Sequence, residues 1–422
     1  MPSLIYGLFN FKSGEFKILA LSCGFIFMLF CSYAILRPIR DALGLEGGQE
    51  ELRWLFLATF ITCILVSLSL MGLSTKIKRR LYVDCIFYFF VFNLLIFYAL
   101  MQIFDPHTKE FIWLSRVFYV WMSVFNLFAF SSAWSLLADV FSKEASKRLF
   151  GIVSAGASFG SIVGSVSTSI LMENFGVSNL IFLSIALLIL SIVLKNLILR
   201  QLQYFESVQV FKRFDQVIGS KNPFIGFKLI IQSKYLLMLC AFIVLLTSVS
   251  TFLYMEQARI IREIFPTREA RIVAFANIDF IVQISALLIQ IFLTAKIAQF
   301  FGTISLLSIL GFVIALGFIL LSFTHPAFLP LAVVMSIRRI GEYALVKPGR
   351  EMLFVPLDAD SKYKVKNFLD TVVYRGGDAF SAQVESFLAG IGIMCVLLCG
   401  AIISLIWGGL GVLLGKYYEK MQ

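Results

Sequence analysis

The sequence predicts an all-α membrane protein in which twelve transmembrane helices are arranged as six and six. Hydrophobic residues make up 59% of the 422-residue chain and charged residues only 14%, a balance that excludes an ordinary soluble globule. Twelve apolar runs are long enough to cross the hydrocarbon core of a bilayer, which takes roughly 20 residues of helix. Strands of a membrane barrel would be shorter and would alternate polar with apolar residues, so we expect helices.

The expected spans follow one another along the whole chain. They cover residues 18–36, 54–74, 82–103, 112–138, 150–171, 178–199, 235–257, 272–294, 302–323, 327–347, 366–388 and 391–414. The first is too long for the core of a signal peptide and no small-residue cleavage site follows it, so we expect it to remain in the mature protein. The fifth carries glycine at positions 156, 160 and 164, a spacing that favours close helix packing.

The longest break between spans divides the chain into two sets of six. We expect an N-terminal six-helix bundle over 1–199, a cytoplasmic linker over 200–234 with a short interfacial helix, and a C-terminal six-helix bundle over 235–422. This layout of parallel halves resembles the major facilitator superfamily fold, whose binding site lies near the midplane and is lined mainly by helices one, four, seven and ten. The resemblance implies transport but names no cargo.

Basic residues set the expected orientation. With both termini inside, most lysines and arginines fall in inner segments. The outer loops then hold only Arg37, Arg40, Arg53, Lys109, Arg259, Arg262, Arg268 and Arg271. We therefore expect a multi-pass protein of the bacterial inner (cytoplasmic) membrane with both termini cytoplasmic. The net charge of +11 follows from this bias and from the intramembrane arginines, so we expect no nucleic-acid partner.

The residue types of enzymes and metal sites are sparse in this chain. Its seven cysteines all lie in apolar spans without CxxC spacing, which is typical of small core hydrophobes. The two histidines, His107 and His325, lie in short loops, which disfavours a histidine metal centre. No nucleophile or carboxylate pair stands out, so we expect no enzyme activity, no catalytic residues, no metal and no cofactor.

Arginines inside the apolar spans or at their ends are the strongest functional signal. They are Arg37, Arg116, Arg259, Arg338, Arg339 and Arg375. A guanidinium keeps its proton and costs roughly 2.5–3.5 kcal/mol to place at the centre of a membrane helix, so each needs a partner or a water-filled cavity. They fall mostly on spans one, four, seven and ten. This regularity predicts a cationic cavity built from two similar halves, and hence a carrier for an anion.

Spans one and four carry the first group of candidates. Arg116, Tyr119, Ser123 and Asn126 are spaced by three, four and three residues, which places them on one helical face. A packing role is the alternative, but a stripe that begins with arginine favours cavity lining.

The end of span one has two interpretations. Tyr33 and Arg37 are four residues apart, and Pro38 ends or kinks the helix beside them. Arg37 either lines the cavity or extends to the outer interface, in which case Arg40 and Asp41 form a surface pair.

Spans eight, ten and eleven supply the remaining charged candidates. Arg338 and Glu342 are four residues apart and can pair, either structurally or as part of coupling, whereas Arg339 points elsewhere and can receive a carboxylate or phosphate. In span eleven, Arg375 and Asp378 can neutralise each other. Asp279 is an isolated acid in span eight, and we expect either a proton site or a partner for a basic residue on another helix.

Two segments resemble a known family. Residues 33–43 read YAILRPIRDAL, which is similar to the first-helix signature of the ATP/ADP antiporter family and its bacterial relatives. In the second segment, KPGREM from Lys347 and KVKNFLD from Lys364 precede YRGGD at Tyr374, and the middle stretch resembles the KxKxxID segment of that family. The resemblance implies exchange of nucleotide phosphates without hydrolysis. It also implies a substrate-handling role for Lys366, although Arg40 stands where the translocases usually have lysine.

These observations predict a secondary active transporter that moves an anionic, nucleotide-like phosphorylated metabolite by alternating access, through exchange. The expected substrate-binding residues are Tyr33, Arg37, Arg40, Arg116, Tyr119, Asn126, Arg338, Arg339, Lys366 and Arg375. The expected coupling or gating residues are Asp41, Asp279, Glu342, Asp370 and Asp378. The alternatives are a proton-coupled facilitator for another organic anion and a non-transporting membrane binding protein. We expect a monomer whose partners are a small anionic substrate and the lipid bilayer.

Overall fold

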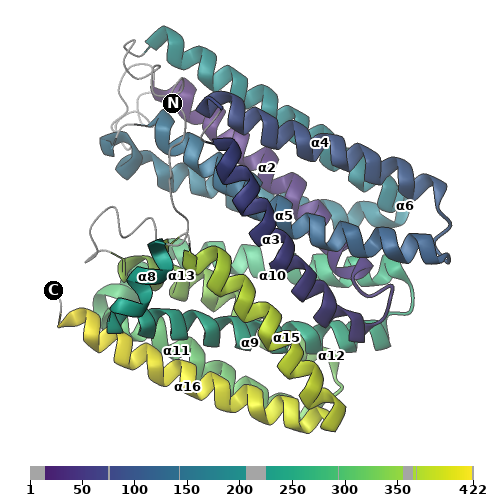
Figure 1. Cartoon of the computed structure of the whole chain (residues 1–422), viewed down its shortest axis with the longest axis vertical. Coiled ribbons are helices and arrows are strands. Elements are labelled where there is room, and N and C mark those ends of the chain that lie inside the picture. Colours follow the sequence, from purple (N-terminus) through teal and green to yellow (C-terminus); the bar gives the residue numbers. More distant parts are fainter. Residues whose placement is uncertain are drawn as a thin grey trace. The chain divides into compact units, whose positions relative to one another are not determined.

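The computed structural model describes residues 15–74, 77–141, 143–205, 225–292, 294–354, 365–366 and 368–420, which are almost entirely helical (Figure 1). In chain order the elements of the first half are α2 (Glu15–Leu43), the short 3₁₀ turn η1 (Gln49–Glu51), α3 (Leu52–Ser74), α4 (Arg79–Ile103), α5 (Lys109–Val140) and α6 (Lys143–Phe205). The second half contains α8 (Ile225–Gln232), α9 (Lys234–Ile264), α10 (Arg268–Phe292), α11 (Thr294–Thr324), α12 (Phe328–Gly341), η2 (Glu342–Val346), α13 (Lys347–Met352), η3 (Leu369–Val373), α15 (Tyr374–Ile391) and α16 (Ile393–Glu419).

The twelve-helix expectation is confirmed. Among the described residues, nine helices are long and apolar enough to cross a membrane. One of them, α6, comprises two spans because the backbone turns at Gly176, where φ is +70°. The two further spans contain α12, which a π-helical turn cuts to 14 residues, and α15, whose three charged side chains lower its hydropathy.

The helices form two compact units. Unit 1 comprises Met1–Arg40, Ser67–Ser220 and Phe275–Phe280, and unit 2 comprises Asp41–Val66, Lys221–Ala274 and Ile281–Gln422. The expected bundle boundaries stay a prediction, and residues 206–224 of the expected linker lie outside the described residues. The short helix expected near its end is present as α8, whose position on the inner surface remains an expectation.

In unit 1, glycines let α6 pack directly on the backbone of α2. A Cβ atom on Gly160 would lie 2.4 Å from the carbonyl oxygen of Phe27, and one on Gly164 would lie 2.5 Å from that of Cys31. Both distances are shorter than any real carbon–oxygen contact of this kind, so only glycine fits. The predicted packing role of the glycine stripe is therefore confirmed.

In unit 2, glycine likewise allows close packing between α11 and α16, which run side by side in Figure 1. A Cβ atom on Gly411 would lie 2.6 Å from the carbonyl oxygen of Leu307. Next to this contact, α9 packs against both α15 and α16, and the rings of Phe242 and Trp407 lie 5.8 Å apart in the buried core. Close helix packing thus provides a rigid frame for the polar residues of unit 2.

Two π-helical turns interrupt the charged spans of unit 2. One, η2, begins at Glu342, and the other, η3, contains Asp370 and ends directly before α15. Such turns shift the side chains that follow them around the helix axis and occur often at functional sites. They therefore mark the region from Arg338 to Asp378 for closer inspection.

Candidate functional site

In unit 1, two polar contacts join α2 and α5. The Asn126 side-chain amide donates to the Tyr33 hydroxyl at 3.0 Å. The Arg40 guanidinium lies over the Tyr119 ring, with its Cζ atom 4.9 Å from the ring centroid. Along α2 the contacts run from Tyr33 to Arg40, and along α5 they run back from Asn126 to Tyr119, seven residues in each case. The two helices are therefore antiparallel at these two contacts. The structure thus brings four of the predicted substrate-binding residues together.

The third α2 candidate, Arg37, meets α10. Its Nε atom lies 3.7 Å from Oδ2 of Asp279, and the Asp279 side chain is buried. Beside this pair, Ser169 of α6 donates to the Asn277 side-chain oxygen at 2.6 Å. Of the two interpretations of Asp279, the structure therefore favours the partner for a basic residue on another helix.

The remaining residues of the predicted α5 stripe make contacts within their own helix. The Cζ atom of Arg116 lies 4.4 Å from the ring centroid of Trp113, which is exposed. Ser123 is buried and donates to the carbonyl oxygen of Tyr119 at 3.3 Å. The stripe shares one face, as predicted, but its contacts with α2 concentrate at Tyr119 and Asn126.

In unit 2, the predicted pair of Arg338 and Glu342 is present at the junction of α12 and η2. Arg338 Nη1 donates to Glu342 Oε2 at 2.9 Å, and the Tyr374 hydroxyl lies 3.5 Å from the other carboxylate oxygen. Arg339 is buried as well. A membrane-spanning segment thus contains two adjacent buried guanidiniums, an arrangement that is costly unless charge or water compensates it.

A second pair lies one helical turn further along α15. Arg375 Nη1 is 3.8 Å from Asp378 Oδ2, and the Thr251 hydroxyl of α9 donates to the other oxygen of Asp378 at 3.0 Å. The predicted pairing of Arg375 with Asp378 is therefore confirmed. The hydroxyls of Tyr374 and Thr251 thus connect the two charged pairs across three spans of unit 2.

The residues of the family-like segments also have partners in unit 2. Asp41 accepts a hydrogen bond from the Tyr254 hydroxyl at 3.0 Å, and Asp370 lies 3.2 Å from Nη2 of Arg350. Lys366 Nζ lies 2.6 Å from Glu351 Oε2, so this amine has an acidic neighbour in the structure. The other residues of the matched segment, at 355–364 and 367, lie outside the described residues.

Sequence reasoning missed several partners. Thr251 and Tyr254 lie on one face of α9 because they are three residues apart, a spacing that was available as a signal. A buried contact between Lys195 of α6 and Asp84 of α4 was also missed. Its signal was a single lysine in the middle of an apolar span, which calls for a partner on another helix.

The fold and these buried charges agree with the family comparison. The sequence profile of the Major Facilitator Superfamily matches residues 17–345, well over half of the chain. This chain belongs to the Major Facilitator Superfamily. It is a multi-pass membrane protein of the facilitator type, and its family points to transport rather than catalysis.

Solved facilitator structures show the same fold. A bacterial homologue of the human lysosomal transporter Spinster is 14% identical, with a TM-score of 0.59 over 98% of this chain and 99% of that one. The nucleoside transporter NupG is 14% identical, with a TM-score of 0.61 over 97% and 99%. A bacterial homologue of the iron transporter ferroportin is 12% identical, with a TM-score of 0.67 over 96% and 100%. At these identities the likeness shows the fold alone. No curated protein matches the chain.

Proposed function

We propose that this facilitator is a secondary active transporter for a small anionic metabolite, moved by alternating access. The observation that carries the proposal is the set of arginines in its membrane-spanning segments. Arg37 and Arg40 belong to unit 1, and Arg338, Arg339 and Arg375 belong to unit 2. Because a guanidinium in a membrane helix is costly, such residues most often mark the path of an ion or substrate.

The chemistry of arginine supports an anionic substrate. A guanidinium presents parallel N–H donors that match both oxygens of a carboxylate or phosphate, and it stays charged at any physiological pH. The acids nearest to these arginines are Asp279, Glu342 and Asp378, and each of them has a cationic neighbour in the structure. Because guanidiniums attract anions and repel cations, the arginines favour an anionic substrate.

A phosphorylated, nucleotide-like cargo is the finer proposal. It is supported by the YAILRPIRDAL and KVKNFLD segments, which resemble the ATP/ADP antiporter family and its bacterial relatives. The contacts of Asp41 with Tyr254 and of Asp370 with Arg350 fix the two aspartates that these segments share with the family. NupG carries nucleosides, by its name, but the ferroportin homologue belongs with iron transporters, so fold similarity alone selects no cargo.

Exchange is the transport mode that we propose. An exchanger needs its loaded state to reorient more readily than its empty state. Intramembrane arginines offer a physical reason, because a bound anion lowers the cost of moving their charge through the reorientation. The alternative of proton symport with another organic anion requires an acid that loses and gains a proton, and a non-transporting binding protein would bind ligand without flux.

A thermal-shift screen tests the substrate class. The purified protein in lipid nanodiscs is heated with nucleotides, sugar phosphates and dicarboxylates, and with neutral and cationic analogues of each. A ligand that binds the native state raises the melting temperature, by about 2.7 kcal/mol of stability at a hundred times Kd. We expect stabilisation by phosphorylated anions only. Stabilisation by cations or neutral solutes, with none by anions, would contradict the proposal.

We further propose that the protein resides in a bacterial inner membrane as a monomer, with both termini cytoplasmic. The distribution of basic residues between inner and outer segments supports this orientation.

A further inference from the structure

A buried charged cluster in unit 2 lies apart from the residues described above. It joins Glu256 and Arg259 of α9, Glu385 of α15, and His325 in the connection between α11 and α12. Arg259 forms ion pairs with both acids, to Glu256 through Nη1 and to Glu385 Oε1 through Nη2 at 2.6 Å. His325 Nδ1 lies 2.8 Å from the second oxygen of Glu256.

The exposed fraction of the side chains increases across this cluster from the two carboxylates to the histidine. The Glu256 and Glu385 side chains are 1% and 0% exposed, Arg259 is 16% exposed, and His325 is 28% exposed. Within the part of the chain that the structure describes, Glu385 Oε2 and Glu256 Oε1 are both buried without a hydrogen-bond partner, and the 2.8 Å between His325 Nδ1 and Glu256 Oε1 is an ion-pair distance rather than a hydrogen bond. A buried ionised oxygen without a donor is far more costly than a neutral hydroxyl oxygen in the same place.

The charges of the cluster do not balance without an extra proton. Two carboxylates face one guanidinium, which leaves one negative charge on buried side chains. Among the described residues, the further groups at this cluster are an amide and two more guanidiniums, which lie outside its ion pairs. The side-chain oxygen of Gln49, once its amide is turned to face Arg259, accepts from that guanidinium at 3.0 and 3.3 Å. Arg53 donates to the Ser386 hydroxyl at 3.3 Å, and Arg262 lies beside Gly48.

We propose that Glu256, Glu385, Arg259 and His325 form a proton-binding site. In its loaded form Glu385 holds the proton on Oε2, so that its Oε1 accepts from Arg259 and Glu256 remains the ionised partner of the guanidinium. His325 is the most exposed member and links the site to water. When a proton enters, the N–H bond at Nδ1 of the imidazolium breaks and an O–H bond forms on Glu256. In a second transfer that O–H bond breaks and one forms on Glu385 Oε2, which leaves a neutral imidazole, an ionised Glu256 and a protonated Glu385.

This site is independent of the anion proposal. It gives the facilitator a titratable acid that does not require Asp279, whose carboxylate lies beside Arg37. A charge-balanced structural cluster is the competing account. In that account both carboxylates stay ionised and His325 stays protonated.

Infrared spectroscopy of the full-length protein in lipid bilayers separates the two accounts. We expect a C=O stretching band from a protonated carboxylic acid at neutral pH, which is lost in Glu385→Gln and is unaffected in Glu263→Gln, a change at an exposed acid on α9, the helix that carries Glu256. Absence of the band in the wild type, or its persistence in both Glu385→Gln and Glu256→Gln, would overturn the proposal.

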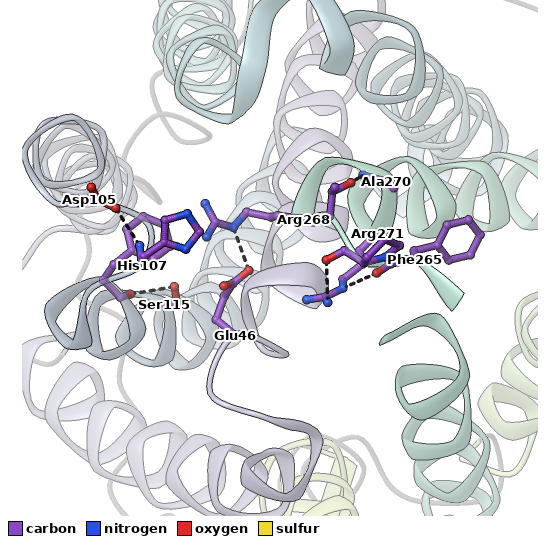
Figure 2. Close-up of polar contacts among 11 residues, drawn as sticks. Glu46, Asp105, His107, Ser115, Phe265, Arg268, Ala270 and Arg271 are labelled. Atoms are coloured by element: carbon purple, nitrogen blue, oxygen red, sulfur yellow. Dashed lines mark hydrogen bonds and ion pairs between the residues drawn. The ribbon is translucent and has the colours of Figure 1, made fainter. Parts of the chain in front are cut away.

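The role of His325 has its own readout in case a carboxyl variant fails to fold. After a jump into deuterated buffer, the carboxyl band of His325→Gln should exchange more slowly than that of the wild type, by roughly 10²-fold, as for loss of a positioned proton-transfer group. His107→Gln, which changes the exposed histidine of the α4–α5 loop (Figure 2), should exchange like the wild type. Equal exchange rates in His325→Gln and the wild type would show that His325 is not the route.

Discussion

Asp279 of α10 and Arg37 of α2 form an ion pair within unit 1, with 3.7 Å between Oδ2 and Nε. The sequence offers no basic residue near Asp279 in its own helix, so the partner comes from a distant part of the chain. The pair matters for mechanism because Arg37 is an expected cavity arginine and Asp279 is the acid in span eight that was also interpreted as a proton site. Each is the charged partner of the other in the structure.

This pair predicts a specific pattern of stability. Asp279→Asn leaves the Arg37 charge without its carboxylate and should destabilise the protein by a few kcal/mol. The loss should be smaller than the roughly 3–5 kcal/mol of fully buried pairs because Arg37 is 19% exposed. Adding Arg37→Gln should recover part of it. Thermal unfolding of the two single variants and the double variant measures the coupling, and simple additivity would rule out the pair as a stabilising contact.

Substrate affinity should depend on the arginines of the membrane-spanning helices. Replacing Arg116 or Arg339 with alanine removes one charge-assisted contact and should cost roughly 1.5–3 kcal/mol of binding, which is about tenfold or more in Kd. Arg200→Ala, at an exposed position near the end of α6, is the matched control. Binding is measured by calorimetry with the anion found in the thermal screen. Wild-type affinity in both variants, with normal membrane insertion, would exclude a role in recognition.

The α2–α6 contact should tolerate no side chain at its glycines. In Gly160→Ala the new methyl group meets the Phe27 carbonyl, so we expect a loss of about 1–3 kcal/mol from overpacking. Gly151→Ala places its methyl group in open space and should be neutral or slightly stabilising, because alanine favours helix. Melting temperatures in nanodiscs test both, and equal behaviour of the two variants would contradict the packing described for α6.

Orientation can be tested at the segment before α8. We expect a single cysteine introduced at Lys221, a position outside the described residues, to react with an impermeant thiol reagent only after the membrane is opened. The seven native cysteines are first replaced by alanine or serine. A cysteine at His107, in the α4–α5 loop, should show the opposite pattern. Labelling of position 221 in intact cells would reverse the proposed topology.

The local features of this fold were predictable from the sequence. Apolar runs predicted the spans, and the four-residue glycine spacing predicted a close-packing face on α6, although not that it contacts α2. Spacings of four and three residues predicted the pairs Arg338–Glu342 and Arg375–Asp378. Each of these depends on one helix and its period, which a single sequence contains.

Partners that lie far apart in the chain were not predictable. Nothing in the periodicity of α2 or α10 selects Asp279 as the partner of Arg37. Likewise, nothing in the periodicity of α9 selects His325 as the partner of Glu256. Both choices depend on how whole helices pack. The π-helical turn η2 was missed for a similar reason. It inserts a residue into a continuous apolar pattern, so the sequence shows one span where the structure has α12, η2 and α13.

Counterflow in proteoliposomes tests the central claim of anion transport by exchange most directly. Vesicles containing the purified protein are preloaded with the stabilising anion, and uptake of the labelled anion is followed with and without an imposed pH gradient. We predict uptake that requires the preload, survives in Asp279→Asn and is reduced in Arg339→Ala. Uptake into empty vesicles that follows the pH gradient and vanishes in Asp279→Asn would contradict exchange, and ligand binding without any flux would contradict transport.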